Sequence, residues 1–206
     1  MCKIHARLKI DALRGLLEST TMSLELIIGP MFAGKSSAAV ARVARAKVLG
    51  WNTLIITSAL DTRYSTSNSI NTHDGTSIPA VKLNKLSEIL TFGDFHSAKL
   101  VVIEEAQFFS DLYDMVTLAV EIHRKNVVVI GLDGDSERKP FGDILKLIPY
   151  ADTITRLTAL CKRCGDGSPA HFTALVEGSK DTQVCVGGSD KYEAMCRRHY
   201  IQNLKY

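Results

Sequence analysis

The sequence predicts an α/β fold: a parallel sheet with crossover helices, followed by a small C-terminal domain held together by a metal. Three observations predict it. Short apolar runs rich in β-branched residues alternate with stretches of helical periodicity, the pattern of a parallel sheet whose strands are joined by helices. A glycine-rich turn joins the first such strand to the first such helix. Two Cys/His pairs with metal-ligand spacing lie near the end of the chain.

Length and composition set the bounds of this fold. The 206 residues suffice for one substantial α/β domain with a small appendage. A hydrophobic content of 46% is ordinary for a soluble globular protein, and no run of 18 apolar residues exists, so we expect no membrane partner. The net charge of +3 is too small to indicate a nucleic-acid partner. Five cysteines, an odd number, favour a reducing compartment, and we expect a cytoplasmic location.

The first strand and helix carry a phosphate-binding motif. A mainly apolar run at residues 24–28 is followed by residues 29–36, GPMFAGKS, which fit G-x-x-x-x-G-K-[ST], the P-loop. Gly34 lets the backbone N–H groups turn toward phosphate oxygens, Lys35 adds positive charge, and the Ser36 hydroxyl is placed to ligate Mg²⁺. A chance glycine-rich turn is the alternative, but such turns rarely sit between a strand pattern and a helix pattern. The residues expected around the phosphates are Gly29, Pro30, Met31, Phe32, Ala33, Gly34, Lys35, Ser36 and Ser37.

The elements after this motif continue the alternation. The helix that opens at Lys35 runs through an Ala-rich stretch and stops at Gly50, the expected C-cap glycine. Strands and helices of these lengths in this order predict a sheet of the RecA-like P-loop class. In chain order we expect a helix at 37–49, a strand at 53–57, a loop or hairpin rim at 61–75, a short helix at 87–90 capped by Ser87, a strand at 100–103, an amphipathic helix at 111–123, a strand at 126–131 and a helical turn at 144–147.

Two adjacent carboxylates end the apolar strand at 100–103. In a P-loop protein this is the position of the carboxylate that holds Mg²⁺ or its water. If the strand stays extended through Glu104 and Glu105, their side chains point to opposite sides. One would then face Ser36 and the metal, and the other would face the acceptor and take its proton. The alternative is two solvated loop glutamates, which the preceding buried strand disfavours.

The late cysteines form the third motif. Cys161 and Cys164, together with Cys196 and His199, supply three thiolates and one imidazole, the ligand set of a closed structural zinc site. Such a site joins distant parts of the chain rather than catalysing a reaction. A redox Cys-x-x-Cys is one alternative, although it needs no second pair. Replacement of His199 by His171 is the other.

These motifs together resemble the zinc-containing, cytosolic-type (type II) thymidine kinases, over residues 24–200. The resemblance rests on an ordered set rather than on one pattern. In order, the set is GPMFAGKSS at 29–37, DTRYS at 61–65, THDG at 72–75, IEEAQFF at 103–109, LDG at 132–134, RKPFG at 138–142, LTALCKRC at 157–164, GGSDKY at 187–192 and CRRH at 196–199.

The resemblance implies transfer of the γ-phosphoryl group of ATP to the 5′-hydroxyl of thymidine with Mg²⁺. It implies that Glu105 is the general base, that Glu104 and Ser36 hold Mg²⁺, and that Asp61, Arg63 and Gln107 lie near the phosphates. It implies a zinc-held lasso over the base, a homotetramer, and dTTP as feedback inhibitor. The residues implied around thymidine are Met31, Phe108, Leu132, Phe141, Thr173, Tyr192 and, through the backbone, Gln183, Val184, Cys185, Val186 and Gly187.

Two positions depart from the family pattern. Glu104 stands where members usually carry Asp, and Ser136 stands where many carry Phe. The longer carboxylate keeps the charge, and the serine removes an aromatic contact to the substrate. Outside these motifs, Arg138, Lys139 and Arg156 are further candidate phosphate ligands.

The resemblance completes the division of the chain. Residues 1–22 are expected to be a flexible tail, and Met22 stays open as an alternative start. Residues 23–158 form the nucleotide-binding domain and residues 159–206 the zinc-binding lid. Two other functions remain open: a kinase for deoxyuridine or deoxycytidine, and an ATPase or nucleic-acid-binding protein whose zinc knuckle contacts DNA. Nucleoside-independent hydrolysis of ATP would favour the last.

Overall fold

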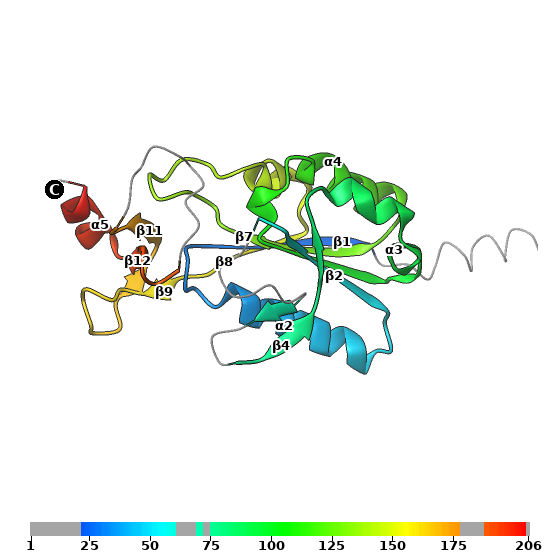
Figure 1. Cartoon of the computed structure of the whole chain (residues 1–206), viewed down its shortest axis with the longest axis horizontal. Coiled ribbons are helices and arrows are strands. Elements are labelled where there is room, and N and C mark those ends of the chain that lie inside the picture. Colours follow the sequence, from blue (N-terminus) through cyan, green and yellow to red (C-terminus); the bar gives the residue numbers. More distant parts are fainter. Residues whose placement is uncertain (1–21, 61–68, 72–74, 178–187, 205–206) are drawn as a thin grey trace, which may run out of the picture.

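A six-stranded sheet forms the centre of the molecule (Figure 1). The computed structural model describes residues 22–60, 69–71, 75–177 and 188–204. The strand order is β5-β2-β6-β7-β1-β8, and every neighbouring pair is parallel, so the predicted P-loop α/β class is confirmed. The strands are β1 (Ser23–Ile28), β2 (Thr53–Ser58), β5 (Val81–Leu83), β6 (Leu100–Glu104), β7 (Asn126–Gly131) and β8 (Thr153–Arg156).

Both faces of the sheet are buried, because helices cover each of them. Alternate side chains of a strand point to opposite faces, so Leu26 packs in one core cluster and Ile27 in the other. On one face lies α2 (Lys35–Val48), which buries Ala39, Val43 and Ala46. On the other lie α3 (Gly93–Ser97) and α4 (Leu112–Thr117), as Figure 1 shows. Burial on both faces explains why these strands read as continuous apolar runs.

The short helices differ from the sequence expectations. The predicted helix at 87–90 is a 3-10 helix, η1 (Leu86–Thr91). Ser87 does not cap it; the Asp111 carboxylate accepts the backbone N–H groups of Leu86 and Ser87 at 3.0 and 2.9 Å. The predicted helix at 111–123 is α4 continued by a π-helical turn, η3 (Leu118–Ile122). The helical turn after residue 143 is the longer 3-10 helix η4 (Ile144–Tyr150).

The C-terminal part lies at one end of the molecule, at the left of Figure 1. It contains two antiparallel pairs, β9 (Ala159–Leu160) with β10 (Pro169–Ala170) and β11 (Phe172–Leu175) with β12 (Tyr192–Met195). The last helix, α5 (Arg197–Asn203), follows β12. A further antiparallel pair, β3 (Ser69–Asn71) and β4 (Ser77–Pro79), lies apart from the main sheet. The division into domains at residue 158 stays a prediction.

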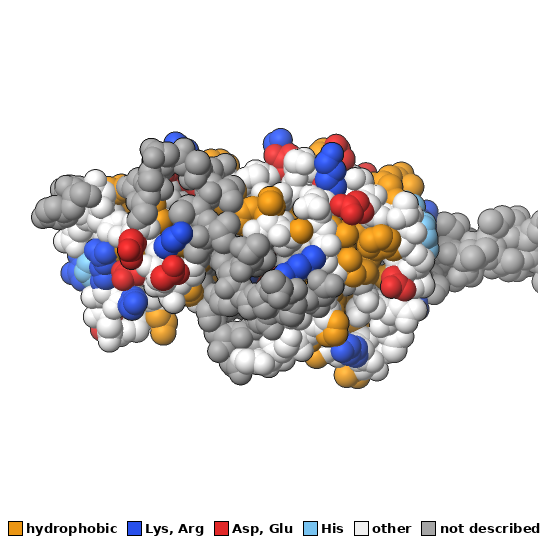
Figure 2. Space-filling view, viewed as in Figure 1, with side chains coloured by type: hydrophobic (Ala, Val, Ile, Leu, Met, Phe, Trp, Pro, Cys, Tyr) orange, Lys and Arg blue, Asp and Glu red, His pale blue; other side chains and the backbone are white. Residues whose placement is uncertain are grey.

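The surface carries both signs of charge. Figure 2 shows acidic and basic side chains intermixed over the C-terminal part, where Arg163 Nε lies 3.0 Å from Glu193 Oε2. Among the described residues, no helix combines the length and the apolar character needed to cross a bilayer.

Candidate functional site

The P-loop connects β1 to α2 at the carboxyl edge of the sheet, where ligands of parallel α/β sheets bind. Gly29 has φ 149°, and a Cβ there would lie 2.5 Å from Leu157 O, so only glycine fits. Gly34, with φ 78°, precedes the first turn of α2, and Phe32 also has a positive φ of 65°. Because the N-cap is glycine, no cap side chain covers the N–H groups of the first turn. The loop thus offers backbone donors and a helix N-terminus to an anion.

Lys35 and Ser36 open α2 beside this loop. The Lys35 ammonium donates to Pro30 O at 2.6 Å, which folds the side chain back over the loop. The Ser36 hydroxyl donates to Glu104 Oε1. Glu104 ends β6 and is only 6% exposed. A hydroxyl and a buried carboxylate side by side form an oxygen donor set that suits Mg²⁺.

The backbone conformation of Glu105 differs from the extended one expected from the sequence. The strand does not run extended through both glutamates; it ends at Glu104, and Glu105 has φ 52° and ψ 41°. The chain turns here from β6 into the 3-10 helix η2 (Ala106–Phe108), closed by the Phe108 N–H donating to Glu105 O at 3.1 Å. The Gln107 amide donates to Glu105 Oε2 at 2.5 Å. A positive φ at a non-glycine residue costs free energy and recurs at functional sites.

An apolar wall adjoins the loop and the carboxylates. It is a cluster drawn from the P-loop, η2, the segment after β7 and the β11–β12 pair, and it contains Met31, Phe32, Phe108, Leu132, Phe141, Leu175 and Tyr192. Phe108 and Phe141 pack edge to face at 5.5 Å. Thr173 lies beside the wall, where its hydroxyl accepts the Met31 N–H at 3.0 Å. The structure therefore brings together all the described side chains expected around the acceptor.

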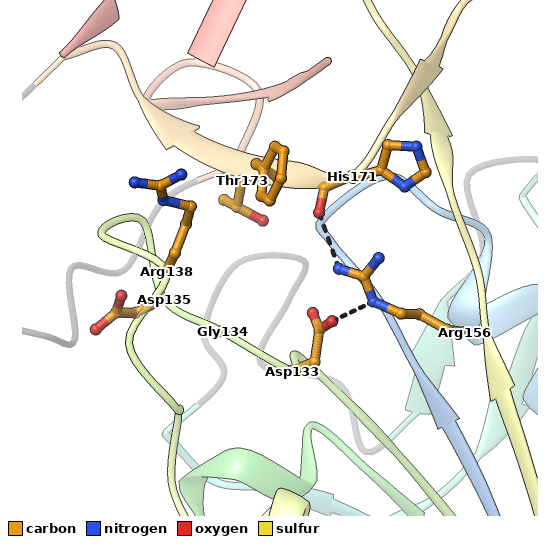
Figure 3. A pocket seen from close by; sticks show the side chains of 8 residues that line it. Asp133, Gly134, Asp135, Arg138, Arg156, His171 and Thr173 are labelled. Atoms are coloured by element: carbon orange, nitrogen blue, oxygen red, sulfur yellow. Dashed lines mark hydrogen bonds and ion pairs between the residues drawn. The ribbon is translucent and has the colours of Figure 1, made fainter. Parts of the chain in front are cut away.

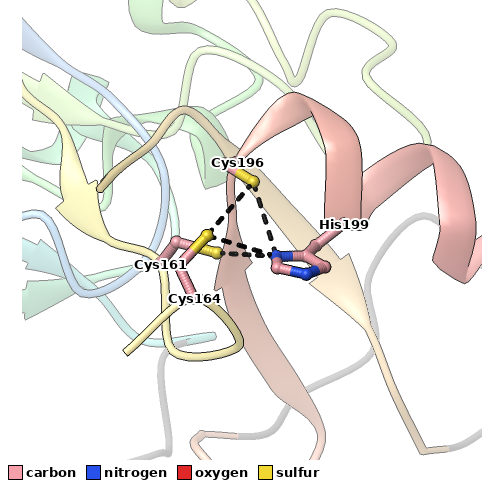
Figure 4. Close-up of side chains that lie close together, drawn as sticks. All are labelled: Cys161, Cys164, Cys196 and His199. Atoms are coloured by element: carbon pink, nitrogen blue, oxygen red, sulfur yellow. Dashed lines mark hydrogen bonds between the residues drawn. The ribbon is translucent and has the colours of Figure 1, made fainter. Parts of the chain in front are cut away.

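The four cysteine and histidine ligands converge (Figure 4). The Nδ1 atom of His199 lies 3.4 Å from the sulfurs of Cys161 and Cys164 and 3.5 Å from that of Cys196. The sulfurs of Cys164 and Cys196 are 3.7 Å apart. Tetrahedral zinc separates two sulfurs by about 3.8 Å and a sulfur from a nitrogen by about 3.5 Å, so the four residues fit zinc. His199, not His171, completes the cluster.

The surroundings shift the pKa values of two of the ligand thiols in opposite directions. Burial opposes ionisation of Cys161, but hydrogen bonds from the Cys196 backbone N–H and from His199 lower the pKa of its thiol to about 6. Burial and the neighbouring Cys161 raise the pKa of Cys164. Thiolates are the form that binds metals, and Cys161 provides one readily at neutral pH.

The three further candidate phosphate ligands already have protein partners. They are Arg138 and Lys139 after β7 and Arg156 at the end of β8. Arg156 and Arg138 line a small pocket of about 160 Å³ next to Thr173 (Figure 3). The Arg156 guanidinium donates to Asp133 at 2.6 Å and to His171 O at 3.3 Å. Arg138 stacks 4.7 Å from the Tyr200 ring. Lys139 pairs with Glu137 at 2.6 Å.

Some expected site residues fall outside the described part of the chain. These are Asp61, Arg63 and the backbone stretch Gln183–Val184–Cys185–Val186–Gly187. One residue of the apolar wall, Leu175, is not among those expected from the sequence. Its signal was present, because Thr173 and Leu175 are two residues apart on one strand and so share a face.

Comparison with known proteins assigns the family. The family model described as thymidine kinase matches residues 22–200. A thymidine kinase of Oryza sativa subsp. japonica is 41% identical over 86% of this chain and 66% of its own length. Thymidine kinase a of Arabidopsis thaliana is 37% identical over 94% of this chain and 81% of its own. The cytosolic thymidine kinase of Homo sapiens is 36% identical over 92% of this chain and 78% of its own. With the P-loop, the paired glutamates and the Cys₃His cluster in place, the chain belongs to the thymidine kinase family.

Proposed function

We propose that the chain transfers the γ-phosphoryl group of ATP to the 5′-hydroxyl of thymidine, giving ADP and dTMP. The observation that carries this proposal is the position of Met31, which belongs both to the P-loop and to the apolar wall. The loop that would hold the triphosphate therefore also belongs to the apolar wall against which the thymine base would pack. Donor and acceptor then meet at the end of β6, where Glu105 lies.

Each residue has a role in this reaction. The P-loop N–H groups and Lys35 hold the phosphates and stabilise the charge of the transferred group. Mg²⁺, when bound, neutralises phosphate charge, and Ser36 and Glu104 would hold it. Glu105 takes the proton of the 5′-hydroxyl as its oxygen attacks phosphorus. The wall at Leu132 and Phe141 packs against the thymine ring and excludes water.

The zinc cluster has a structural role. Cys161 and Cys164 follow β8, whereas Cys196 and His199 flank the start of α5, so zinc would tie together both ends of the segment between them. That segment would close over the base. We further propose a homotetramer in the cytosol with dTTP as feedback inhibitor, from the family resemblance and the similarity to the cytosolic human thymidine kinase.

The test is phosphoryl transfer from γ-labelled ATP with and without a nucleoside. Thymidine should give labelled dTMP, and ATP should be hydrolysed only slowly without it. Deoxyuridine and deoxycytidine, assayed in parallel, define the base preference. ATP hydrolysis that is independent of nucleoside, together with salt-sensitive DNA binding, would overturn the proposal.

A further inference from the structure

The Gln107 side chain connects Glu105, the proposed general base, to the apolar wall. It is 4% exposed. Its Nε2 donates to Glu105 Oε2 at 2.5 Å, and its Oε1 accepts the Leu132 N–H at 3.1 Å. Leu132 is itself part of the apolar wall. One amide therefore contacts both the carboxylate and the backbone of the residue that packs against the acceptor.

The orientation of this amide follows from chemistry. A backbone N–H can only donate, so the amide atom that faces Leu132 must be the oxygen. The NH₂ group then faces Glu105, where it can only donate to a carboxylate oxygen. This hydrogen bond holds the Glu105 carboxylate in one orientation.

Two glycines hold the Gln107 residue in place. A Cβ on Gly131 would overlap Gln107 Oε1, and a Cβ on Gly142 would overlap the Gln107 carbonyl oxygen. Gly131 ends β7 and Gly142 follows Phe141 of the wall. Gly131 lies close to the side-chain amide and Gly142 close to the backbone of Gln107, so the fold holds this residue in place.

We propose that Gln107 is a positioning residue that orients Glu105 against the acceptor wall. This role differs from the phosphate contact expected from the sequence, and it rests on the proposed function, in which Glu105 is the base. Gln107 acts through Glu105, so its loss should lower the rate of the chemical step rather than the affinity for either substrate.

Gln107→Asn tests this role, because the amide is kept but becomes one methylene too short to bridge both partners. We expect kcat to fall on the order of 10²-fold, while KM for ATP and for thymidine changes less than about twofold. Gln202→Asn, a matched change at an exposed position on α5, should leave both constants unchanged. A raised KM for ATP with unchanged kcat would instead identify Gln107 as a phosphate contact and overturn the proposal.

A double-mutant cycle separates positioning from a general structural effect. In a Glu105→Gln background, Gln107→Asn should cost no further activity. An equal fold loss in both backgrounds would overturn the proposal. If Gln107→Asn does not fold, judged by its thermal melt, the isosteric Gln107→Glu replaces it in the kinetic assay, where the same loss of kcat is expected. Failure of the proposed function looks different, because the unsubstituted protein would then form no dTMP.

Discussion

At the scale of single residues, sequence neighbours take different roles. Glu104 is buried at the end of β6 against Ser36, whereas Glu105 lies in the turn that follows and contacts Gln107. The motif spacing predicts where both carboxylates lie, because the P-loop and the end of β6 share one edge of the sheet. It does not predict the positive φ of Glu105, because the preceding apolar run continues to Ile103 with no turn signal. It gives no sign of the Gln107 bridge either, because one of its two partners, the Leu132 N–H, lies 25 residues away along the chain.

Thr173 joins the C-terminal part to the P-loop through one hydrogen bond. Thr173→Val keeps the volume but removes the hydroxyl that accepts the buried Met31 N–H. We expect the free energy of unfolding to fall by about 1–3 kcal/mol, measured by urea denaturation, and KM for ATP to rise. Thr173→Ser keeps the hydroxyl and is the control. Equal stabilities of the Val and Ser variants would contradict this role.

At the scale of elements, strands are predicted better than short helices. Strands buried on both faces read as apolar runs, so β1, β2, β6 and β7 are found within about one residue of their predicted bounds. The 3-10 helices and the π-helical turn depend on distant partners, as the Asp111 cap of η1 shows. A local pattern cannot reveal a cap that comes from 24 or 25 residues away.

Asp111→Asn tests this distant cap. Burial raises the pKa of the Asp111 carboxyl, but the N–H groups of Ser87 and Leu86 lower it below its ordinary value overall. A lowered pKa means that the carboxylate stabilises the fold above the pH where the unfolded chain titrates, and that this stabilisation is lost as the pH falls. We expect Asp111→Asn to cost about 1 kcal/mol near pH 7, because the amide nitrogen cannot accept one of the two N–H groups.

The measurement is the melting temperature as a function of pH. The difference between parent and variant should shrink as the pH falls below about 4. Asp114→Asn, at an exposed position in α4, is the control and should have little effect at any pH. A difference that stays constant down to pH 3 would contradict the carboxylate cap.

At the scale of the molecule, the Cys₃His cluster holds the C-terminal part together, because all four of its residues belong to that part. Its ligands were predicted because two C-x₂-[CH] pairs have a recognised spacing. The connection of Tyr200 to Ser136 O at 2.6 Å, which ties α5 to the segment after β7, has no such spacing and was not predicted. The C-terminal part is thus held together by the Cys₃His cluster and tied to the segment after β7 by a hydrogen bond.

Cys161→Ala tests the structural role of the Cys₃His cluster. Loss of one ligand should release zinc and loosen the segment that we propose to lie over the base, so KM for thymidine should rise at least about tenfold and more than KM for ATP. Zinc content, measured on the same preparation, should fall from about one equivalent to near zero. Cys2→Ala, which removes a thiol that belongs to neither C-x₂-[CH] pair of the sequence, should change neither. Full zinc content with normal thymidine affinity would contradict the assignment.

The most direct test of the whole account is Glu105→Gln, which removes the base and keeps the shape of the side chain. Turnover with ATP and thymidine should fall on the order of 10²–10⁴-fold, while equilibrium binding of both substrates remains within about threefold. Glu121→Gln, the same change at an exposed position in η3, should have normal turnover. A near-normal rate for Glu105→Gln would show that Glu105 is not the general base, and it would contradict the proposed transfer of the 5′-hydroxyl proton to this residue.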